Sequence, residues 1–237
     1  MRGHMSRIEG ALFFCLAALI LTFPAATARA ETIVFDNFGP GDTYDTGFAY
    51  LLANDGDWQS AWAFQFQPSA SGYVSDIWLP VNLFRSIYSK EYNLQIALMT
   101  DSGADRPQDV LETWTFSVLS RTSDGIIVHG IGNGTTEISE GVKYWLAGTV
   151  PSGTDSVTQW YSKPIEPTDA DLYFYKESIG FEEPWGSPSV GTAAAFRIAV
   201  STPPQAVPSM SEYGMMIFLA LVGSISLVYL RKQTRES

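Results

Sequence analysis

Residues 61–67 read Ala-Trp-Ala-Phe-Gln-Phe-Gln and decide the fold class. Large apolar side chains recur at every second position, at Trp62, Phe64 and Phe66, and Pro68 follows the run. Because successive side chains of a strand point to opposite faces, this alternation is typical of a strand with one buried face. The stretch therefore predicts a β-strand rather than a helix.

Short β-prone stretches of this kind recur along most of the chain. Turn-forming groups such as Asp101-Ser102-Gly103 and Gly132-Asn133-Gly134 separate them, and no long stretch has a helical period. The predicted strands are 32–36, 61–67, 72–83, 92–100, 111–119, 125–131, 142–150, 156–162, 171–176 and 194–201. Many short strands without helices predict an all-β domain over residues 31–201, an antiparallel β-sandwich or jelly roll.

The charge of the chain is strongly acidic. The 237 residues carry a formal net charge of −11, and residues 31–207 contain 22 Asp and Glu against 8 Lys and Arg, a net of −14. A negative surface repels phosphate backbones, so the composition argues against a nucleic-acid partner.

Residues 1–30 have the layout of a secretory signal peptide. Arg2 and Arg7 precede an apolar stretch, and Ala28-Arg29-Ala30 offers small residues at the expected cleavage positions. Cleavage after Ala30 by the general secretion machinery would also remove Cys15, the one cysteine of the chain. The exported domain is therefore expected to depend on core burial rather than on disulfides.

The other end of the chain predicts a membrane anchor. Residues 215–230 are uncharged and apolar, and Arg231, Lys232 and Arg235 follow within the basic segment 231–237. As a helix the run would span roughly 24 Å, which is adequate when flanking Arg and Lys side chains reach the interface. Basic residues favour the cytoplasmic side. We therefore predict one C-terminal transmembrane helix over 215–230, with residues 231–237 as a cytoplasmic stop-transfer tail.

A linker and a motif occupy residues 202–214, between the domain and this span. The linker is rich in proline, and the motif consists of Val207, Pro208, Ser209, Met210, Ser211, Glu212, Tyr213 and Gly214. The motif resembles the Ile-Pro-Thr-Leu-Ser-Glu-Trp-Gly signature of IPTL-CTERM tails, relatives of the PEP-CTERM sorting signals of Gram-negative bacteria. The resemblance implies an exosortase-type membrane transpeptidase as partner, which would cut near the motif. The protein would be held transiently in the inner membrane and then reach the cell surface or the extracellular space.

The domain itself also resembles a known family. Residues 36–45 read Asp-Asn-Phe-Gly-Pro-Gly-Asp-Thr-Tyr-Asp and look like the opening of the "choice-of-anchor R" domains. Further similar segments are 98–103, 111–114, 142–146 and 195–198. Such domains occur on exported bacterial proteins with interchangeable C-terminal sorting signals, and the family has no assigned activity. The resemblance implies a surface or extracellular-matrix protein.

The mature chain is poorly supplied for catalysis. It would keep one histidine, His129, and no cysteine, and it has no glycine-flanked serine elbow. The neighbouring carboxylates Glu182 and Glu183 would point to opposite faces of a strand, whereas glycoside hydrolysis needs two facing carboxyl groups. We therefore predict no catalytic residues and no enzymatic activity, and we interpret His129 as a strand residue that faces solvent or a neighbouring strand.

Asp-rich turns suggest calcium as a candidate ligand, since calcium accepts many oxygen ligands in flexible geometry. The candidate metal ligands are Asp36, Asp42, Asp45, Asp55, Asp57, Asp101 and Asp105. Aspartate also favours turns for reasons unrelated to metals. No other cofactor is expected.

Aromatic residues near predicted turns suggest a carbohydrate ligand. Core or edge packing is the favoured interpretation for each of them singly; the alternative is that they stack on the sugar rings of an exopolysaccharide, and the candidates are Trp58, Trp160, Tyr161 and Trp185. Two functions are therefore predicted: a non-catalytic displayed protein, and alternatively a carbohydrate-binding module, with or without calcium.

Overall fold

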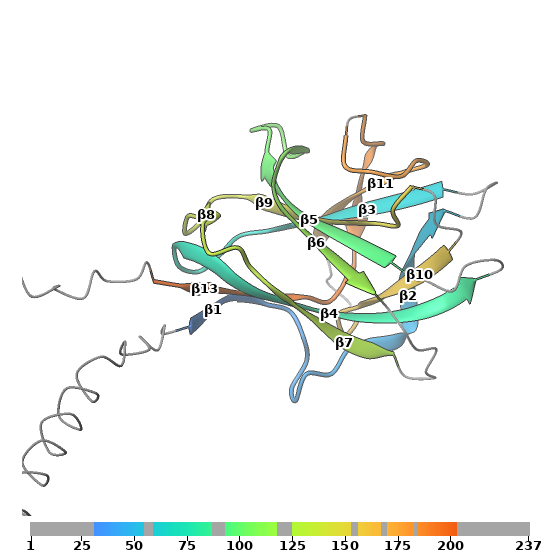
Figure 1. Cartoon of the computed structure of the whole chain (residues 1–237), viewed down its shortest axis with the longest axis horizontal. Coiled ribbons are helices and arrows are strands. Elements are labelled where there is room, and N and C mark those ends of the chain that lie inside the picture. Colours follow the sequence, from blue (N-terminus) through green and yellow to red (C-terminus); the bar gives the residue numbers. More distant parts are fainter. Residues whose placement is uncertain are drawn as a thin grey trace, which may run out of the picture. The chain divides into compact units, whose positions relative to one another are not determined.

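The computed structural model describes residues 31–54, 59–86, 93–117, 125–152, 156–166, 170–182 and 184–202. These residues belong to one compact unit, Ala30–Pro203. Within them the chain forms thirteen β-strands, every named pair of which is antiparallel, and no helix (Figure 1). The predicted all-β, antiparallel fold is confirmed.

The strands follow one another along the whole unit. They are β1 (Glu31–Asp36), β2 (Asp45–Asn54), β3 (Gln59–Phe66), β4 (Gly72–Ser86), β5 (Asn93–Asp101), β6 (Pro107–Ser117), β7 (Ile126–Ile131), β8 (Glu137–Ile138), β9 (Tyr144–Thr149), β10 (Ser156–Ser162), β11 (Asp171–Lys176), β12 (Pro188–Gly191) and β13 (Arg197–Ser201). Each predicted segment contains a strand, and β2, β8 and β12 are additional. β2 escapes the pattern because Tyr50-Leu51-Leu52-Ala53 is a continuous apolar run, which periodicity cannot assign.

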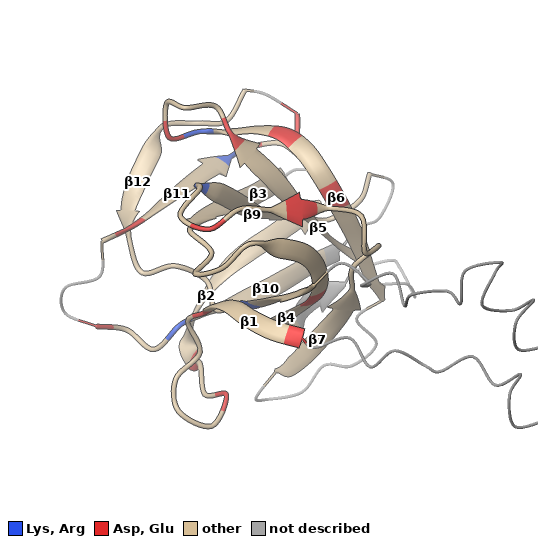
Figure 2. Ribbon diagram, turned by 90° about the vertical axis from the view of Figure 1, so that its left-hand side faces the viewer, with Lys and Arg blue, Asp and Glu red and all other residues tan. Residues whose placement is uncertain are grey.

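The strands form two halves of one curled sheet. In the first half, here the six-stranded layer, the order is β12–β11–β3–β9–β5–β6. In the second half, here the β4 layer, β13 and β10 pair with one edge of β4, and β7 and β8 pair with its other edge. β1 adds to β13 and β2 adds to β10. The hairpin from β2 to β3 connects the two layers, which lie one above the other in Figure 2.

The main core fills the space between the two layers. Phe64 on β3 and Trp160 on β10 are both fully buried, and their rings meet edge to face with centroids 5.1 Å apart. The indole lies directly on the backbone of β9, because a Cβ atom at Gly148 would come within 3.0 Å of its ring. Its Nε1 donates to the Ala195 carbonyl at 2.9 Å, so the buried polar atom is satisfied.

The first and last strands of the unit are neighbours. β1 pairs with β13, with Glu31 opposite Ser201 and Asp36 opposite Arg197. The chain therefore enters and leaves the folded unit at adjacent positions.

Several predictions lie outside the described residues. These are the signal peptide 1–30, the motif 207–214, the helix 215–230 and the tail 231–237, together with Asp55, Asp57 and Trp58. In the ranges that the structure does describe, there is no helix with the length and apolar character needed to cross a membrane.

Candidate functional site

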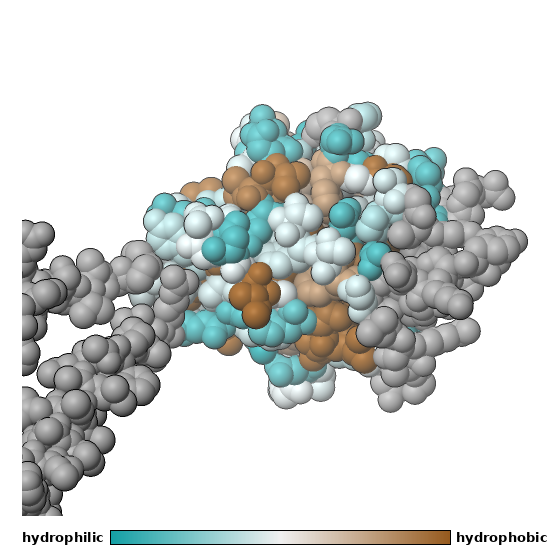
Figure 3. Space-filling model, in the orientation of Figure 1, coloured by the Kyte–Doolittle hydropathy of each residue, from teal (hydrophilic) through white to brown (hydrophobic). Residues whose placement is uncertain are grey.

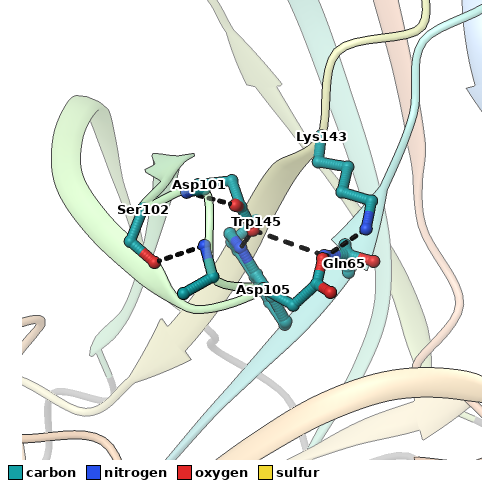
Figure 4. A network of polar contacts seen from close by, with 8 residues as sticks. Gln65, Asp101, Ser102, Asp105, Lys143 and Trp145 are labelled. Carbon is teal, nitrogen blue, oxygen red and sulfur yellow. Dashed lines mark hydrogen bonds and ion pairs between the residues drawn. The ribbon is translucent and has the colours of Figure 1, made fainter.

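The turn between β5 and β6 holds two of the predicted metal ligands in a polar network (Figure 4). Asp101 Oδ2 accepts hydrogen bonds from Trp145 Nε1 at 2.8 Å and from Gln65 Nε2 at 3.4 Å. The same Gln65 nitrogen lies 3.1 Å from Asp105 Oδ1, which also forms an ion pair with Lys143. Gln65 therefore bridges the two aspartates.

The shape of this turn suits its sequence. Asp101 Oδ1 accepts the backbone N–H of Gly103 at 2.7 Å, and Gly103 has a φ of 76°, a conformation that glycine adopts at little cost. The hydrogen bond from Lys143, followed by that from Gln65, holds the pKa of Asp105 below its usual value. The network thus fixes the turn to β3 and β9 through donors of the protein itself.

Asp36 and Asp42 meet at a different place, on β13. The Nη2 atom of Arg197 lies 2.7 Å from Asp36 Oδ2 and 2.6 Å from Asp42 Oδ1, and the guanidinium lies over the ring of Phe38 with its Cζ 5.3 Å from the centroid. Asp45 is used locally, since its Oδ1 accepts the N–H of Gly47 at 2.7 Å. A single side-chain cation, Arg197, is therefore already paired with both aspartates that the fold brings together.

The predicted calcium ligands that the structure describes do not share one site. They are divided among the β5–β6 turn, the Arg197 cluster and the start of β2. Throughout the described part of the chain, no three His, Cys, Asp or Glu side chains are placed to hold a metal ion.

For three of the four candidate sugar-stacking residues, the structure shows packing and contradicts the sugar-stacking alternative. Trp160 is 0% exposed, and Tyr161 and Trp185 are 3% exposed each. Trp160 belongs to the core, Tyr161 stacks with Tyr44 at 5.5 Å, and Trp185 covers the outer face of the six-stranded layer. Proximity to a turn failed as a guide, because Trp160 and Tyr161 lie within strand β10, and the loop residue Trp185 folds back onto the sheet to leave water.

His129 lies mid-strand on β7 with an exposed side chain, which confirms the prediction for it. Its ring is parallel to that of Trp78, with an interplanar angle of 3° and centroids 4.9 Å apart, and its Nε2 lies 2.5 Å from Asp76 Oδ1. Glu31 lies on β1, which is separated from β4 by β13. Partial burial raises the pKa of Glu31, and the negative charge of Asp76 raises it further. Arg197 on β13 and His129 on β7 lie on opposite sides of Trp78, and the Cζ of Arg197 is 5.9 Å from the Trp78 ring centroid. Contacts among these side chains, Asp76 and Glu31 therefore link strands β1, β13, β4 and β7.

Sequence reasoning missed a second group of aromatic side chains, here the side aromatic cluster. It consists of Trp62 on β3, Tyr173 and Tyr175 on β11, and Phe48 on β2, which joins them through Tyr50, with the Phe48 and Tyr50 ring centroids 5.3 Å apart. Trp62 lies 4.7 Å from Tyr175 and 5.8 Å from Tyr173, measured between ring centroids. Phe48 is 44% exposed and the other three are partly exposed. The alternation Tyr173-Phe174-Tyr175 indicates that Tyr173 and Tyr175 share one face of a strand. It does not indicate that this face is exposed to solvent.

The other exposed apolar residues are dispersed. Figure 3 shows them on one face as several brown groups separated by hydrophilic side chains. Besides Phe48, the large apolar residues exposed in the described ranges are Ile33, Val110, Leu111, Ile127, Ile131, Val142, Ile165 and Val190. Scattered exposed apolar residues of this kind are ordinary in folded proteins.

A search of protein-family models with this chain found no match, and a search of curated proteins found none either.

Proposed function

We propose that the protein is an exported, non-catalytic protein of the cell surface or extracellular matrix, displayed or released through its C-terminal sorting signal. The observation that carries this proposal is the pairing of β1 with β13. Because Glu31 lies opposite Ser201, the folded unit is connected to the rest of the chain at one place. Such a domain suits attachment through a single tether, because the rest of its surface stays accessible to molecules outside the cell.

The packing of the unit suits export without disulfides. Four tryptophans donate their indole N–H groups within the protein: Trp62 to Leu51, Trp114 to Ile131, Trp145 to Asp101 and Trp160 to Ala195. Satisfied, close-packed aromatic side chains supply burial that a cysteine-free domain of this size needs. We propose that this curled, two-layered sheet is a β-sandwich domain of the choice-of-anchor R type.

The tail supplies the second half of the proposal. Its order of motif, apolar run and basic end is that of a sorting signal read by an exosortase-type membrane transpeptidase. A proline at position 208 would prevent a helix from extending back through the motif, so an extended backbone would be presented to the enzyme at the membrane surface.

The experiment is a deletion of residues 208–212 in the native host, followed by cell fractionation and mass measurement of the product. We expect the deleted protein to stay in the inner membrane at its uncleaved mass. The matched control deletes the five residues 202–206, which shortens the tether but leaves the motif. Normal cleavage and location of the 208–212 deletion would refute the sorting proposal.

Carbohydrate binding is the second candidate function. One observation favours it: the rings of the side aromatic cluster are partly exposed and could contact a sugar, whereas three of the four aromatic residues that the sequence suggested are buried.

A further inference from the structure

We propose that the side aromatic cluster of Phe48, Trp62, Tyr173 and Tyr175 is a binding site for a neutral glycan. This inference goes beyond display by the tail, and it depends on the folded unit alone. It names the ligand class and the residues for the second candidate function.

The cluster lies where the six-stranded layer extends past the β4 layer. One row across β3, β11 and β12 contains Phe64, Tyr173 and Ser189, which share a face because they are direct partners in the ladder. Phe64 is fully buried, Tyr173 is partly exposed and Ser189 is exposed. This face of the sheet therefore passes from the core into solvent along a single row. Figure 2 shows β11 and β12 in one layer and β2 in the other, on the same side of the molecule.

The rings are held in place from beneath. Tyr50 on β2 is 4% exposed and lies 4.8 Å from Trp62 and 5.7 Å from Tyr173 between ring centroids. The Trp62 indole is oriented by its hydrogen bond to the Leu51 carbonyl at 2.9 Å. Fixed aromatic faces lose little side-chain entropy when a ligand stacks on them, and the C–H face of a sugar ring is such a ligand.

The hydroxyl groups distinguish this cluster from ordinary core. The buried tyrosines have paired hydroxyls: that of Tyr50 donates to the Thr192 carbonyl, that of Tyr144 accepts from the Ser139 N–H at 3.1 Å, and that of Tyr161 accepts from Asn82 at 3.1 Å. Among the described residues, by contrast, the hydroxyls of Tyr173 and Tyr175 form no hydrogen bond to the protein. A sugar can make two contacts with such a residue: its C–H groups stack on the aromatic ring, and its hydroxyl groups form hydrogen bonds with the tyrosine hydroxyl.

The surrounding charge selects a neutral ligand. The ion pair of Lys163 and Asp171, with Nζ and Oδ2 2.7 Å apart, lies at the start of β11 and is neutral as a pair. Residues 31–207 carry a net charge of −14, which disfavours an acidic polysaccharide through long-range repulsion. A neutral hexose chain meets no such penalty.

The test measures binding of neutral oligosaccharides to the purified full-length chain, in a detergent without a sugar headgroup. The probes are hexasaccharides of β-1,4-glucose, β-1,3-glucose, α-1,4-glucose and β-1,4-mannose, and the readouts are titration calorimetry and tryptophan fluorescence. We expect at least one probe to bind. The double variant Tyr173→Phe and Tyr175→Phe keeps both rings and should weaken that binding by about tenfold, because two hydrogen bonds are lost. Phe48→Ala should weaken it as well.

The matched control is Val190→Ala on β12. Val190 is exposed close to the cluster, but its ladder partner is Leu172, so it belongs to the opposite face. This variant should bind as the unchanged protein does. Absence of binding by every probe to a folded protein, or equal binding by the double Phe variant, would overturn the proposal. So would concentration-dependent dimer formation that Phe48→Ala abolishes, since the face would then be covered by a second copy. Sorting by the tail would stand in each case.

Discussion

The six-stranded layer has two buried faces of different construction. Phe64, Leu146 and Leu98 lie in one row on the inner face, and Ala63, Ala147 and Ala97 form the neighbouring row on the outer face. All six are essentially fully buried. The inner row is covered by another layer of sheet, whereas the outer row is covered by the segment between β11 and β12, which brings Trp185 and Phe181 over it.

The difference shows how a loop can close a second, smaller core. Alanine side chains let the covering segment approach the sheet closely, and large rings at the margin, among them Trp145 and Phe174, complete the cluster. Lys176 is 6% exposed, donates to the Glu182 carbonyl at 2.8 Å and lies 4.8 Å from the Trp185 ring centroid. The segment between β11 and β12 should therefore rearrange around a mutated side chain more readily than a layer of paired strands does.

The largest expected effect compares two phenylalanines on opposite faces of this layer. Phe64 and Phe174 are both fully buried, on the neighbouring strands β3 and β11. Phe64→Ala should lower the free energy of unfolding by about 4 kcal/mol, because the rings around it cannot close the cavity. Phe174→Ala should cost about 3 kcal/mol, at the low end for a buried phenylalanine, because the covering segment can settle into the space. Urea denaturation of both variants measures the difference, and equal losses would show that the outer cover is as rigid as the inner layer.

A smaller effect is expected when the cover loses its anchor. Trp185→Ala should lower the free energy of unfolding by about 1–2 kcal/mol and expose the peptide bond after Lys176 to trypsin. Trp185→Phe keeps a ring over the alanines and serves as the control. If trypsin cleaves the alanine variant there no faster than the unchanged protein, Trp185 does not hold the segment down.

The smallest expected effect concerns the outer face of the β4 layer, which carries charge instead of an apolar cover. Desolvation and Asp76 raise the pKa of Glu31 above its ordinary 4.5, so the folded state binds this proton more tightly than the unfolded state does. Its contribution to stability is complete below that ordinary pKa and is lost as pH rises through the higher folded value. Glu31→Gln should therefore match the unchanged protein at about pH 3.5 and melt at a slightly higher temperature at about pH 7. Melting curves across this range test the sign, and a lower melting temperature of the variant at neutral pH would contradict it.

Much of the fold was predictable from local pattern, as in β10 and β11. Alternating apolar residues and Gly- or Asp-containing turns are properties of neighbouring positions, and they hold wherever one strand face is buried. β2 was not predictable, because its apolar run is continuous, and β8 and β12 are too short to show a period.

The candidate site was less predictable than the fold. The sequence indicated aromatic and acidic residues near turns, but Trp160 lies in the core and Asp101 accepts a hydrogen bond from Trp145. Exposure depends on what a side chain meets across the sheet, and that partner is distant in sequence. Only the tertiary structure makes Tyr173 and Tyr175 candidates, because it shows that their face of the sheet passes from the core into solvent.

The sequence by itself determined the all-β class, the acidic charge and the order of segments that predicts export and sorting, since each depends on local composition. Tertiary structure alone decided that β1 pairs with β13, that Arg197 joins Asp36 and Asp42 from positions 161 and 155 residues away, and that four rings gather at one side. The physical reason is that burial and pairing depend on contacts between distant segments, whereas alternation reports only that a strand has two unlike faces.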